Sequence, residues 1–377
     1  MNGKKMSKLK NVLCYFLLVL LFAGFGPFSC EDNPMFVEHL NQPISGGSNI
    51  SCASDGTKYW SLGVDYPPAT GTAKIAKRTF DGVITTYTDA SSSESGFSGP
   101  ILEGSDGNIW TFGLNDAGDS VIDVVKMTPA GVFTHYSLPA AINGADACLG
   151  PDGNIWFTEF SLGKIAKIDT SGTITEYAIT AGQSPGGIAS DGTKLWVAAV
   201  NGSFHVFIKS YNTSGVQQTS ADTGSTYIVP GRVFLGKPGE YWLWNGIANE
   251  RVLRVLADGT VLSTDLPYFD INFASGTDLL RGPDSFIAVG ALLTDSGNVT
   301  WQIAKISLDN ELVELSNISP NKSRVFDSTC YDPSDQLYYS LIGEVTDVGT
   351  DAKLISFEDS NEVRLMEGDA SYYERRE

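Results

Sequence analysis

The chain has 377 residues, of which 42% are hydrophobic and 18% are charged, and it contains 40 glycines and 16 prolines. It is too long for one compact core of the usual size, and its composition excludes a disordered chain, so we expect several domains or one repetitive architecture with many turns. The formal net charge of −19 argues against nucleic acid as a partner, because an acidic protein repels phosphate groups.

The first 30 residues are predicted to be a signal peptide. A lysine-rich start is followed by an apolar run from Val12 to Gly26, which is shorter than the roughly 20 residues that span a bilayer. Ser29 then precedes Cys30, an order that resembles a bacterial lipoprotein signal, although Pro27 and Phe28 depart from its usual pattern. We expect lipidation of Cys30 and export to the bacterial cell envelope, anchored to a membrane by that lipid; ordinary cleavage and secretion is the alternative.

Three cysteines remain after the predicted signal and Cys30. Cys52, Cys148 and Cys330 are odd in number and far apart in sequence, which is typical neither of a disulfide framework nor of a metal motif. We therefore interpret all three as free, buried cysteines that pack like small apolar residues.

Residues 31–377 are predicted to form one domain, because a single motif recurs throughout them. Each copy has an Asp-Gly-like turn followed by short apolar runs, and the six intervals between the first and last turn average 46.5 residues. Four short strands per copy are typical of a propeller blade, and seven copies predict an all-β, seven-bladed propeller of four-stranded antiparallel blades. The equivalent turn positions are Asp55, Asp106, Asp152, Asp191, Pro238, Asp284 and Ser334.

An aromatic residue follows the turn in six of the seven copies, and Ala288 takes its place in the sixth. A large flat side chain at the repeat period indicates packing between blades rather than a ligand site. These residues are Trp60, Trp110, Trp156, Trp196, Trp242 and Tyr338.

The two ends of the domain are predicted to meet in blade seven. Phe36 to Leu40 resembles the fourth, outer strand of other copies, while the seventh copy offers a fourth strand of its own at Glu362 to Met366. We expect the N-terminal segment to pair in blade seven, either replacing or flanking the C-terminal one, and to close the ring without a covalent cross-link.

The third copy, "GPDGNIWFTEF" followed by "GKIAKIDTSGTITEY", closely resembles the repeat of the streptogramin B lyases (virginiamycin B lyase family). It resembles NHL-type and gluconolactonase-like propellers more distantly. The resemblance implies a seven-bladed propeller, a general-base histidine near the start of a blade, and carboxylates at the "WFTE" position that hold magnesium.

The residues that the resemblance implies for catalysis are mostly missing. Only Glu159 carries an acid at the "WFTE" position, and the three histidines, His39, His135 and His205, fall in segments expected to be third or fourth strands. We therefore predict no catalytic residue and no metal set, and no cofactor, with magnesium or calcium as the weaker alternative.

Charged and polar side chains at the expected mouth of the central channel are the candidate binding residues. They suit a small molecule, a peptide or a protein, but they are equally compatible with a solvated rim. We expect a monomeric ligand- or partner-binding protein; the alternative is a metal-dependent lyase or lactone hydrolase. The candidates are Asp146, Glu159, Arg232, Asn245, Arg324 and Asp327.

Overall fold

The computed structural model describes residues 38–43, 49–62, 73–90, 96–115, 120–142, 146–226, 231–244, 252–263, 273–283, 285–293, 299–318, 324–346 and 349–358. The predicted signal peptide, Cys30, Asn245 and Glu362 to Met366 lie outside these residues. The chain divides into two compact units, Met1–Met35 and Phe36–Glu377, and the second is described below.

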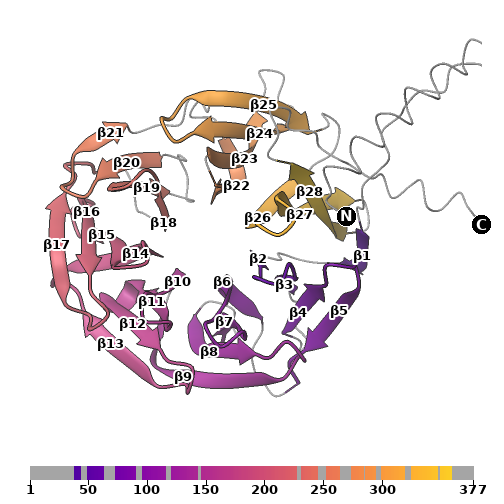
Figure 1. The fold of residues 1–377 in the computed structure, drawn as a ribbon, viewed down its shortest axis with the longest axis horizontal. Coiled ribbons are helices and arrows are strands. Elements are labelled where there is room, and N and C mark those ends of the chain that lie inside the picture. Colours follow the sequence, from indigo (N-terminus) through magenta and orange to yellow (C-terminus); the bar gives the residue numbers. More distant parts are fainter. Residues whose placement is uncertain are drawn as a thin grey trace, which may run out of the picture. The chain divides into compact units, whose positions relative to one another are not determined.

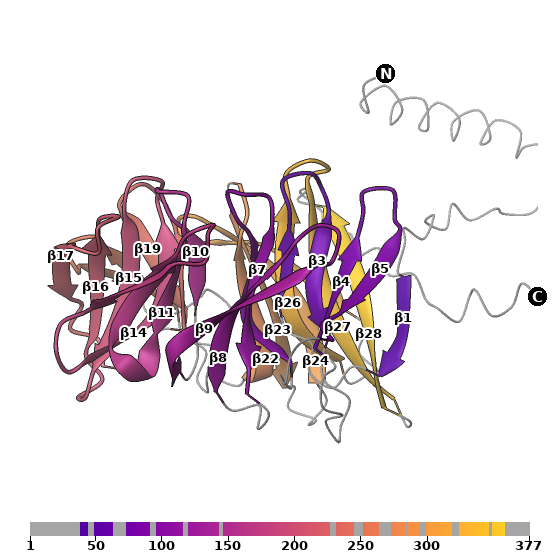
Figure 2. The same cartoon turned by 90° about the horizontal axis from the view of Figure 1, so that it is seen from below.

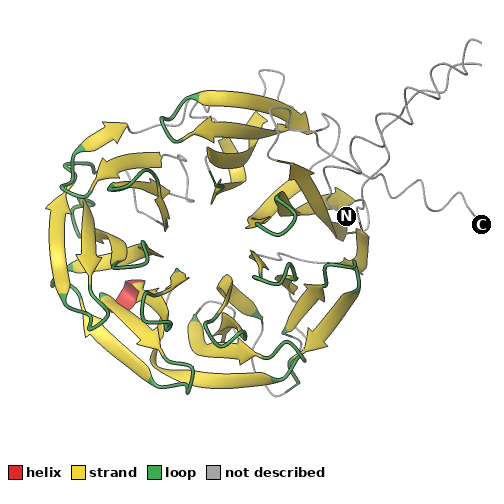
Figure 3. Cartoon of the chain, viewed as in Figure 1, coloured by secondary structure: helices red, strands yellow, loops and turns green. Residues whose placement is uncertain are grey.

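Seven four-stranded antiparallel sheets are arranged as the blades of a ring (Figure 1). Each innermost strand contacts the innermost strand of the next sheet, and the last contacts the first. The predicted fold class, an all-β propeller of seven four-stranded blades, is confirmed. Within the described residues, a single helical turn, η2 (Phe160–Leu162), interrupts the strands (Figure 3), and no helix there is long and apolar enough to cross a membrane.

The first three blades run in chain order from the inner to the outer strand. Their strands are β2 (Ile50–Cys52), β3 (Lys58–Leu62), β4 (Lys74–Arg78) and β5 (Ile84–Thr88); β6 (Phe97–Glu103), β7 (Ile109–Leu114), β8 (Val121–Met127) and β9 (Phe133–Ile142); and β10 (Ala147–Leu149), β11 (Ile155–Glu159), β12 (Lys164–Ile168) and β13 (Ile174–Ala178).

The next three blades repeat this order, and the seventh takes its outer strand from the start of the domain. Their strands are β14 (Gln183–Ser190), β15 (Leu195–Asn201), β16 (Val206–Tyr211) and β17 (Gln217–Asp222); β18 (Arg232–Leu235), β19 (Glu240–Trp244), β20 (Val252–Leu256) and β21 (Val261–Ser263); β22 (Phe273–Arg281), β23 (Ser285–Leu293), β24 (Val299–Ser307) and β25 (Leu312–Ile318); and β26 (Arg324–Asp332), β27 (Leu337–Thr346), β28 (Gly349–Glu358) and β1 (Glu38–Pro43).

In blades two, three and four, the turn aspartate accepts a hydrogen bond from the indole N–H of the tryptophan that follows it. In blade three the indole N–H of Trp156 donates to Asp152 at 2.9 Å, and the same carboxylate accepts the backbone N–H of Asn154. Burial opposes ionisation of Asp152, but these hydrogen bonds and Lys167 lower the pKa of its carboxyl below the ordinary value. The repeated sequence thus fixes both the turn and the tryptophan that follows it.

The repeat aromatics pack between blades, as predicted. Trp156 is fully buried, and Trp196 of blade four stacks on Tyr241 of blade five with ring centroids 4.1 Å apart. Trp242 stacks on Phe286 of blade six at the same separation. Such stacked pairs stabilise beyond the area that they bury, so these rings hold neighbouring blades together rather than binding a ligand. The side chain of Ala288 is not among those described.

The N-terminal strand closes the ring, which confirms the predicted pairing. β1 is the fourth strand of blade seven and pairs antiparallel with β28, with Glu38 opposite Leu354. The predictions of free cysteines and of closure without a covalent cross-link were wrong, however, because Cys52 and Cys330 form a disulfide between the inner strands of blades one and seven. The odd cysteine is Cys148, which is free. The sequence could not pair Cys52 with Cys330, because only closure of the ring brings residues 278 positions apart together.

Candidate functional site

The candidate residues lie at one end of the channel. The turns between the first and second strands emerge together at the other end of the blades, at the top of Figure 2. The inner strands therefore start, and the second strands end, at the opposite end of the blades. The residues there include Asp146 before β10, Arg232 in β18 and Glu159 in β11.

Asp146 is a buried acid at the junction of blades three and four. Its side chain is 8% exposed, and its Oδ2 accepts the backbone N–H of Ile188 in blade four at 2.8 Å. Burial raises the pKa of its carboxyl to about 6, against the opposing effects of the Arg232 charge and of the N–H groups of Ile188 and Ala147. The group therefore changes its charge near neutral pH.

A glycine-containing bulge in β14 allows blades three, four and five to approach closely. The register of β14 shifts between Pro185 and Ile188, which frees the Ile188 N–H for Asp146. The hydroxyl of Thr158 donates to the carbonyl of Gly186 at 2.9 Å. A β-carbon at Gly187 would lie 2.5 Å from the carbonyl carbon of Arg232, so only glycine fits there. The bulge places an acid and an arginine from different blades within electrostatic reach.

Glu159 lies on the other side of blade three. Its side chain is fully buried, and among the described residues neither of its carboxylate oxygens has a hydrogen-bond partner. Burial, and secondly the charge of Glu176, raise the pKa of its carboxyl to about 7, while Lys164 acts in the opposite direction. Lys164 itself donates to Glu176 Oε2 at 2.7 Å, which leaves Glu159 next to an ion pair of which it is not a member.

Asp146 and Glu159 do not form a carboxylate pair. Thr158, opposite Asp146, points toward Gly186 of blade four, whereas Phe157 packs in the cluster shared with blade two. Because side chains alternate along a strand, Glu159 shares the face of Phe157. The structure therefore separates the two acids that the sequence placed together at the channel mouth.

The remaining candidates are placed by their backbone alone or lie outside the described residues. Arg324 begins β26, the inner strand of blade seven, and Asp327 sits at the bulge between Phe326 and Ser328 in the same strand. Asn245 follows β19 and is not described. The site thus retains Asp146 with Arg232 as its described charged groups of opposite sign.

The described residues do not offer a set of ligands that fits a metal ion. Magnesium takes oxygen ligands from carboxylates and other groups in octahedral geometry, and no group of three or more His, Cys, Asp or Glu side chains lies close enough to hold an ion in the described part of the chain. The carboxylate oxygens of Glu159 accept no hydrogen bond from the described residues. The charged groups near it are Glu176 and Lys164, which form an ion pair with each other.

All three histidines of the chain lie away from the inner strands. His39 is in β1, the outermost strand of blade seven. His135 is in β9, the outer strand of blade two, and its ring nitrogens lie 2.6 Å from Asp89 Oδ2 and 3.4 Å from Asp123 Oδ2. His205 precedes β16 and lies 3.3 Å from Asp222 Oδ2. His39 and His135 are in outer strands, as the sequence predicted, whereas His205 lies just before the third strand in which it was expected.

The polar network that anchors Asp146 was not predicted from the sequence. The Ile188 amide belongs to a bulge in β14 and the Thr158 hydroxyl to β11, and hydrophobic periodicity reveals neither contact. The only signal in the sequence was "SPGGIAS", Ser184 to Ser190, where two adjacent glycines interrupt a strand. Glycine inside a strand often marks a bulge or a close approach of two backbones, and both occur here.

Comparison with known proteins identifies relatives of the fold. Virginiamycin B lyase from Staphylococcus aureus is 21% identical, with a TM-score of 0.60 over 85% of this chain and 98% of that one. A catalytically inactive His-to-Ala variant of the same enzyme with quinupristin is 20% identical, with a TM-score of 0.58 over 85% and 98%. A streptogramin B lyase structure is 19% identical, with a TM-score of 0.58 over 85% and 97%. At these identities the likeness shows the fold alone.

Among curated protein sequences, none matches the chain. A family model does match: that of the virginiamycin B lyase family, over residues 49–272. This segment is more than half of the chain, and it contains blades one to five, in which the turns, the tryptophans and the Asp146 junction lie. The chain therefore belongs to the virginiamycin B lyase family.

Proposed function

We propose that this propeller is an exported, lipid-anchored binding protein that takes a small charged molecule or a peptide at the channel mouth, rather than a lyase. The observation that carries the proposal is the Asp146 junction, where the buried acid of blade three accepts the Ile188 amide of blade four and the charge of Arg232 in blade five acts on the pKa of its carboxyl. Opposite charges at one mouth suit a ligand with both an amine and a carboxylate, such as a short peptide.

Two features support export. The Cys52–Cys330 disulfide belongs to a class of bonds that persist in oxidising compartments and are rare in the cytosol. The N-terminal order of lysines, apolar run, small residue and cysteine resembles a lipoprotein signal. Mass spectrometry of the protein from its native membrane tests this part: a mature N-terminus at a lipid-modified Cys30 is expected, and an unmodified N-terminus beyond it contradicts the anchor.

Binding is tested by calorimetry with a library of short peptides that have free termini. For a peptide that binds, Asp146→Asn should weaken affinity about tenfold or more, because a hydrogen bond to a charged group contributes about 1.5–3 kcal/mol. Thr158→Val is the matched control: it disturbs the same junction but keeps the charge. Equal loss in both variants would mean that Asp146 acts only by holding the blades together.

A lyase or lactone hydrolase is the second candidate, and Glu159 is the observation that favours it. A carboxyl with a pKa of about 7 is suited to general-base catalysis at neutral pH, and this acid lies where the family repeat has one. The test is incubation with quinupristin and magnesium, followed by mass spectrometry. We expect no ring-opened product; product that disappears with Glu159→Gln would establish the enzyme.

A further inference from the structure

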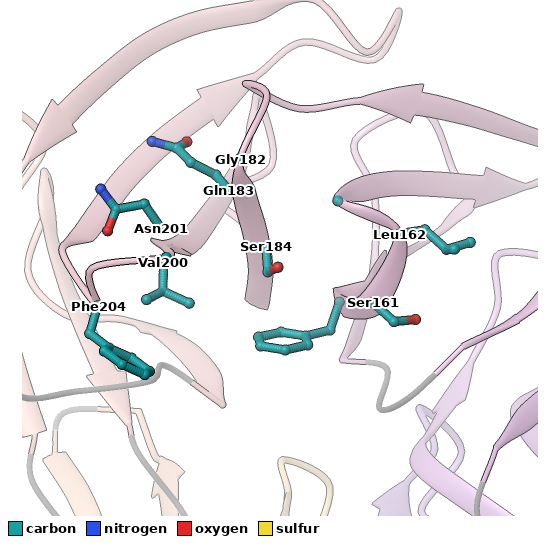
Figure 4. A pocket seen from close by; sticks show the side chains of 11 residues that line it. Ser161, Leu162, Gly182, Gln183, Ser184, Val200, Asn201 and Phe204 are labelled. Carbon is teal, nitrogen blue, oxygen red and sulfur yellow. The ribbon is translucent and has the colours of Figure 1, made fainter.

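A cavity of about 410 Å³ lies between blades three and four, at the end of the blades where Glu159 ends β11. Figure 4 shows Ser161 on the blade-three side and Val200 and Phe204 on the blade-four side. The cavity is formed by η2, by the start of β14 and by the end of β15 with the turn that follows. Its volume is within the range of about 300–1,000 Å³ that is usual for small-molecule sites. Asp146 and Arg232 are not part of its lining.

The lining carries no charge. None of its eleven residues is acidic, basic or histidine, in a chain with a formal net charge of −19. A charged ligand would lose water there without gaining a partner of opposite charge, which is unfavourable. The cavity therefore suits a neutral ligand, unlike the channel mouth.

Phe204 is held at the rim in a strained conformation. The residue is 58% exposed, and its backbone φ of 60° is in the left-handed region that bulky residues rarely adopt. Asn201 fixes this turn: its Oδ1 accepts the N–H groups of Ser203 and His205, each at 3.0 Å, and its carbonyl accepts the N–H of Phe204 at 2.9 Å. Strain of this kind concentrates at functional sites. With Phe160 on the blade-three side, the cavity has an aromatic residue on each wall.

One polar atom of the lining lacks a hydrogen-bond donor. Gln183 is paired with Asn201 across β14 and β15, and the two amides lie on the same side of this strand pair (Figure 4). Gln183 Oε1 is buried and, among the residues that the structure describes, accepts no hydrogen bond. A buried acceptor without a donor is unfavourable by the full cost of its desolvation. A ligand with a hydroxyl group would supply that donor.

We propose that this cavity binds a neutral sugar ring. A pyranose offers apolar C–H faces that pack on the rings of Phe160 and Phe204, and its hydroxyls donate to Gln183 Oε1. An aromatic side chain of a peptide would fill the same space but would leave Gln183 without a donor. This site is separate from the proposed binding site at Asp146, and neither proposal depends on the other.

The test is ligand-observed NMR and calorimetry on the mature protein, with cellobiose, maltose and chitobiose as probes. Saturable binding of at least one is expected. Phe204→Asn should weaken it about tenfold, the size of an aromatic stacking contribution, and keeps the turn, because asparagine tolerates the left-handed region. Gln183→Met, which removes the acceptor while keeping the shape, should weaken it as well.

Phe80→Ala is the matched control, since Phe80 is 65% exposed in blade one and does not line this cavity; it should leave sugar binding unchanged. The proposal is overturned if none of the three sugars binds, or if binding persists in Phe204→Asn. It is likewise overturned if a phenylalanine-containing tetrapeptide binds in a Phe204-dependent manner while the sugars do not. Failure of peptide binding at Asp146 would leave this result unaffected.

Discussion

Cys52 and Cys330 form a disulfide whose Cα atoms are 5.7 Å apart, although 278 positions separate the two residues in the sequence. The bond joins the inner strands of the first and last blades. Next to it, Lys58 of blade one donates to Asp332 of blade seven at 2.5 Å, with both side chains fully buried. The disulfide closes the ring covalently at its inner strands, and β1 closes it at the outer strands by its hydrogen bonds to β28.

Removing this disulfide should destabilise the propeller. Cys52→Ser should lower the free energy of unfolding by about 2–5 kcal/mol, since the bond restricts the unfolded chain across most of its length. Thermal unfolding, followed by circular dichroism with and without reductant, measures the effect. The wild type and Cys148→Ser should both lose stability in reductant, while Cys52→Ser should not respond. A wild type that is insensitive to full reduction would contradict this role.

The N-terminal strand should contribute to closure independently of the disulfide. Deleting residues 31–43 removes β1 and exposes the edge of β28, so the thermal midpoint should fall by several degrees. An exposed edge strand also pairs with other chains, and light scattering should show more aggregation on heating. An unchanged midpoint would mean that β1 adds nothing to blade seven.

The blades could be predicted from the sequence because the turn and strand signals of each copy lie within that copy. Asp152 and Trp156 are four residues apart and hydrogen-bonded, so local sequence alone sets this turn. The outer strand β1 was also predicted, because its residues resemble those of the other outer strands. Both features are local in sequence and repeat at the blade period.

The candidate site was predicted less well, because it depends on contacts between blades. Asp146 is fixed by the Ile188 amide, 42 positions away, through a bulge. Glu159 is in the same blade as Asp146, but strand alternation places it on the opposite face, where the Lys164–Glu176 pair lies. Neither a bulge nor the identity of a neighbour in the next blade can be read from periodicity.

Gly172 should be intolerant of alanine for two reasons that can be separated. It adopts a φ of +94°, and a β-carbon would lie 1.8 Å from the ring of Tyr136 in the preceding blade. Gly192 has a φ of +84° but nothing within 4 Å. Gly192→Ala should therefore destabilise by about 1–2 kcal/mol from backbone strain alone. Gly172→Ala should cost about 1–3 kcal/mol more from overpacking. Denaturant unfolding compares them; equal losses would show that contact between the blades does not matter here.

Neutralising Glu159 should stabilise the protein above neutral pH. Its folded-state pKa of about 7 is above the ordinary value of 4.5, so between these values the unfolded chain loses a proton that the folded chain keeps. Ionisation therefore lowers stability progressively as the pH rises through this window, and the loss is constant above it. Glu159→Gln removes this loss and should raise the free energy of unfolding by about 1–3 kcal/mol at pH 8, with little change at pH 4.

Glu176→Gln provides the contrast for this pH dependence. It removes the acceptor of the Lys164 ion pair as well as a charge that raises the pKa of Glu159. It therefore should not reproduce the gain of Glu159→Gln at pH 8, because Lys164 loses its hydrogen-bonded partner. Urea unfolding at pH 4, 6 and 8 distinguishes the two variants. If Glu159→Gln changes the stability equally at all three values, the carboxyl has the same pKa in the folded and the unfolded chain, so burial does not control its titration.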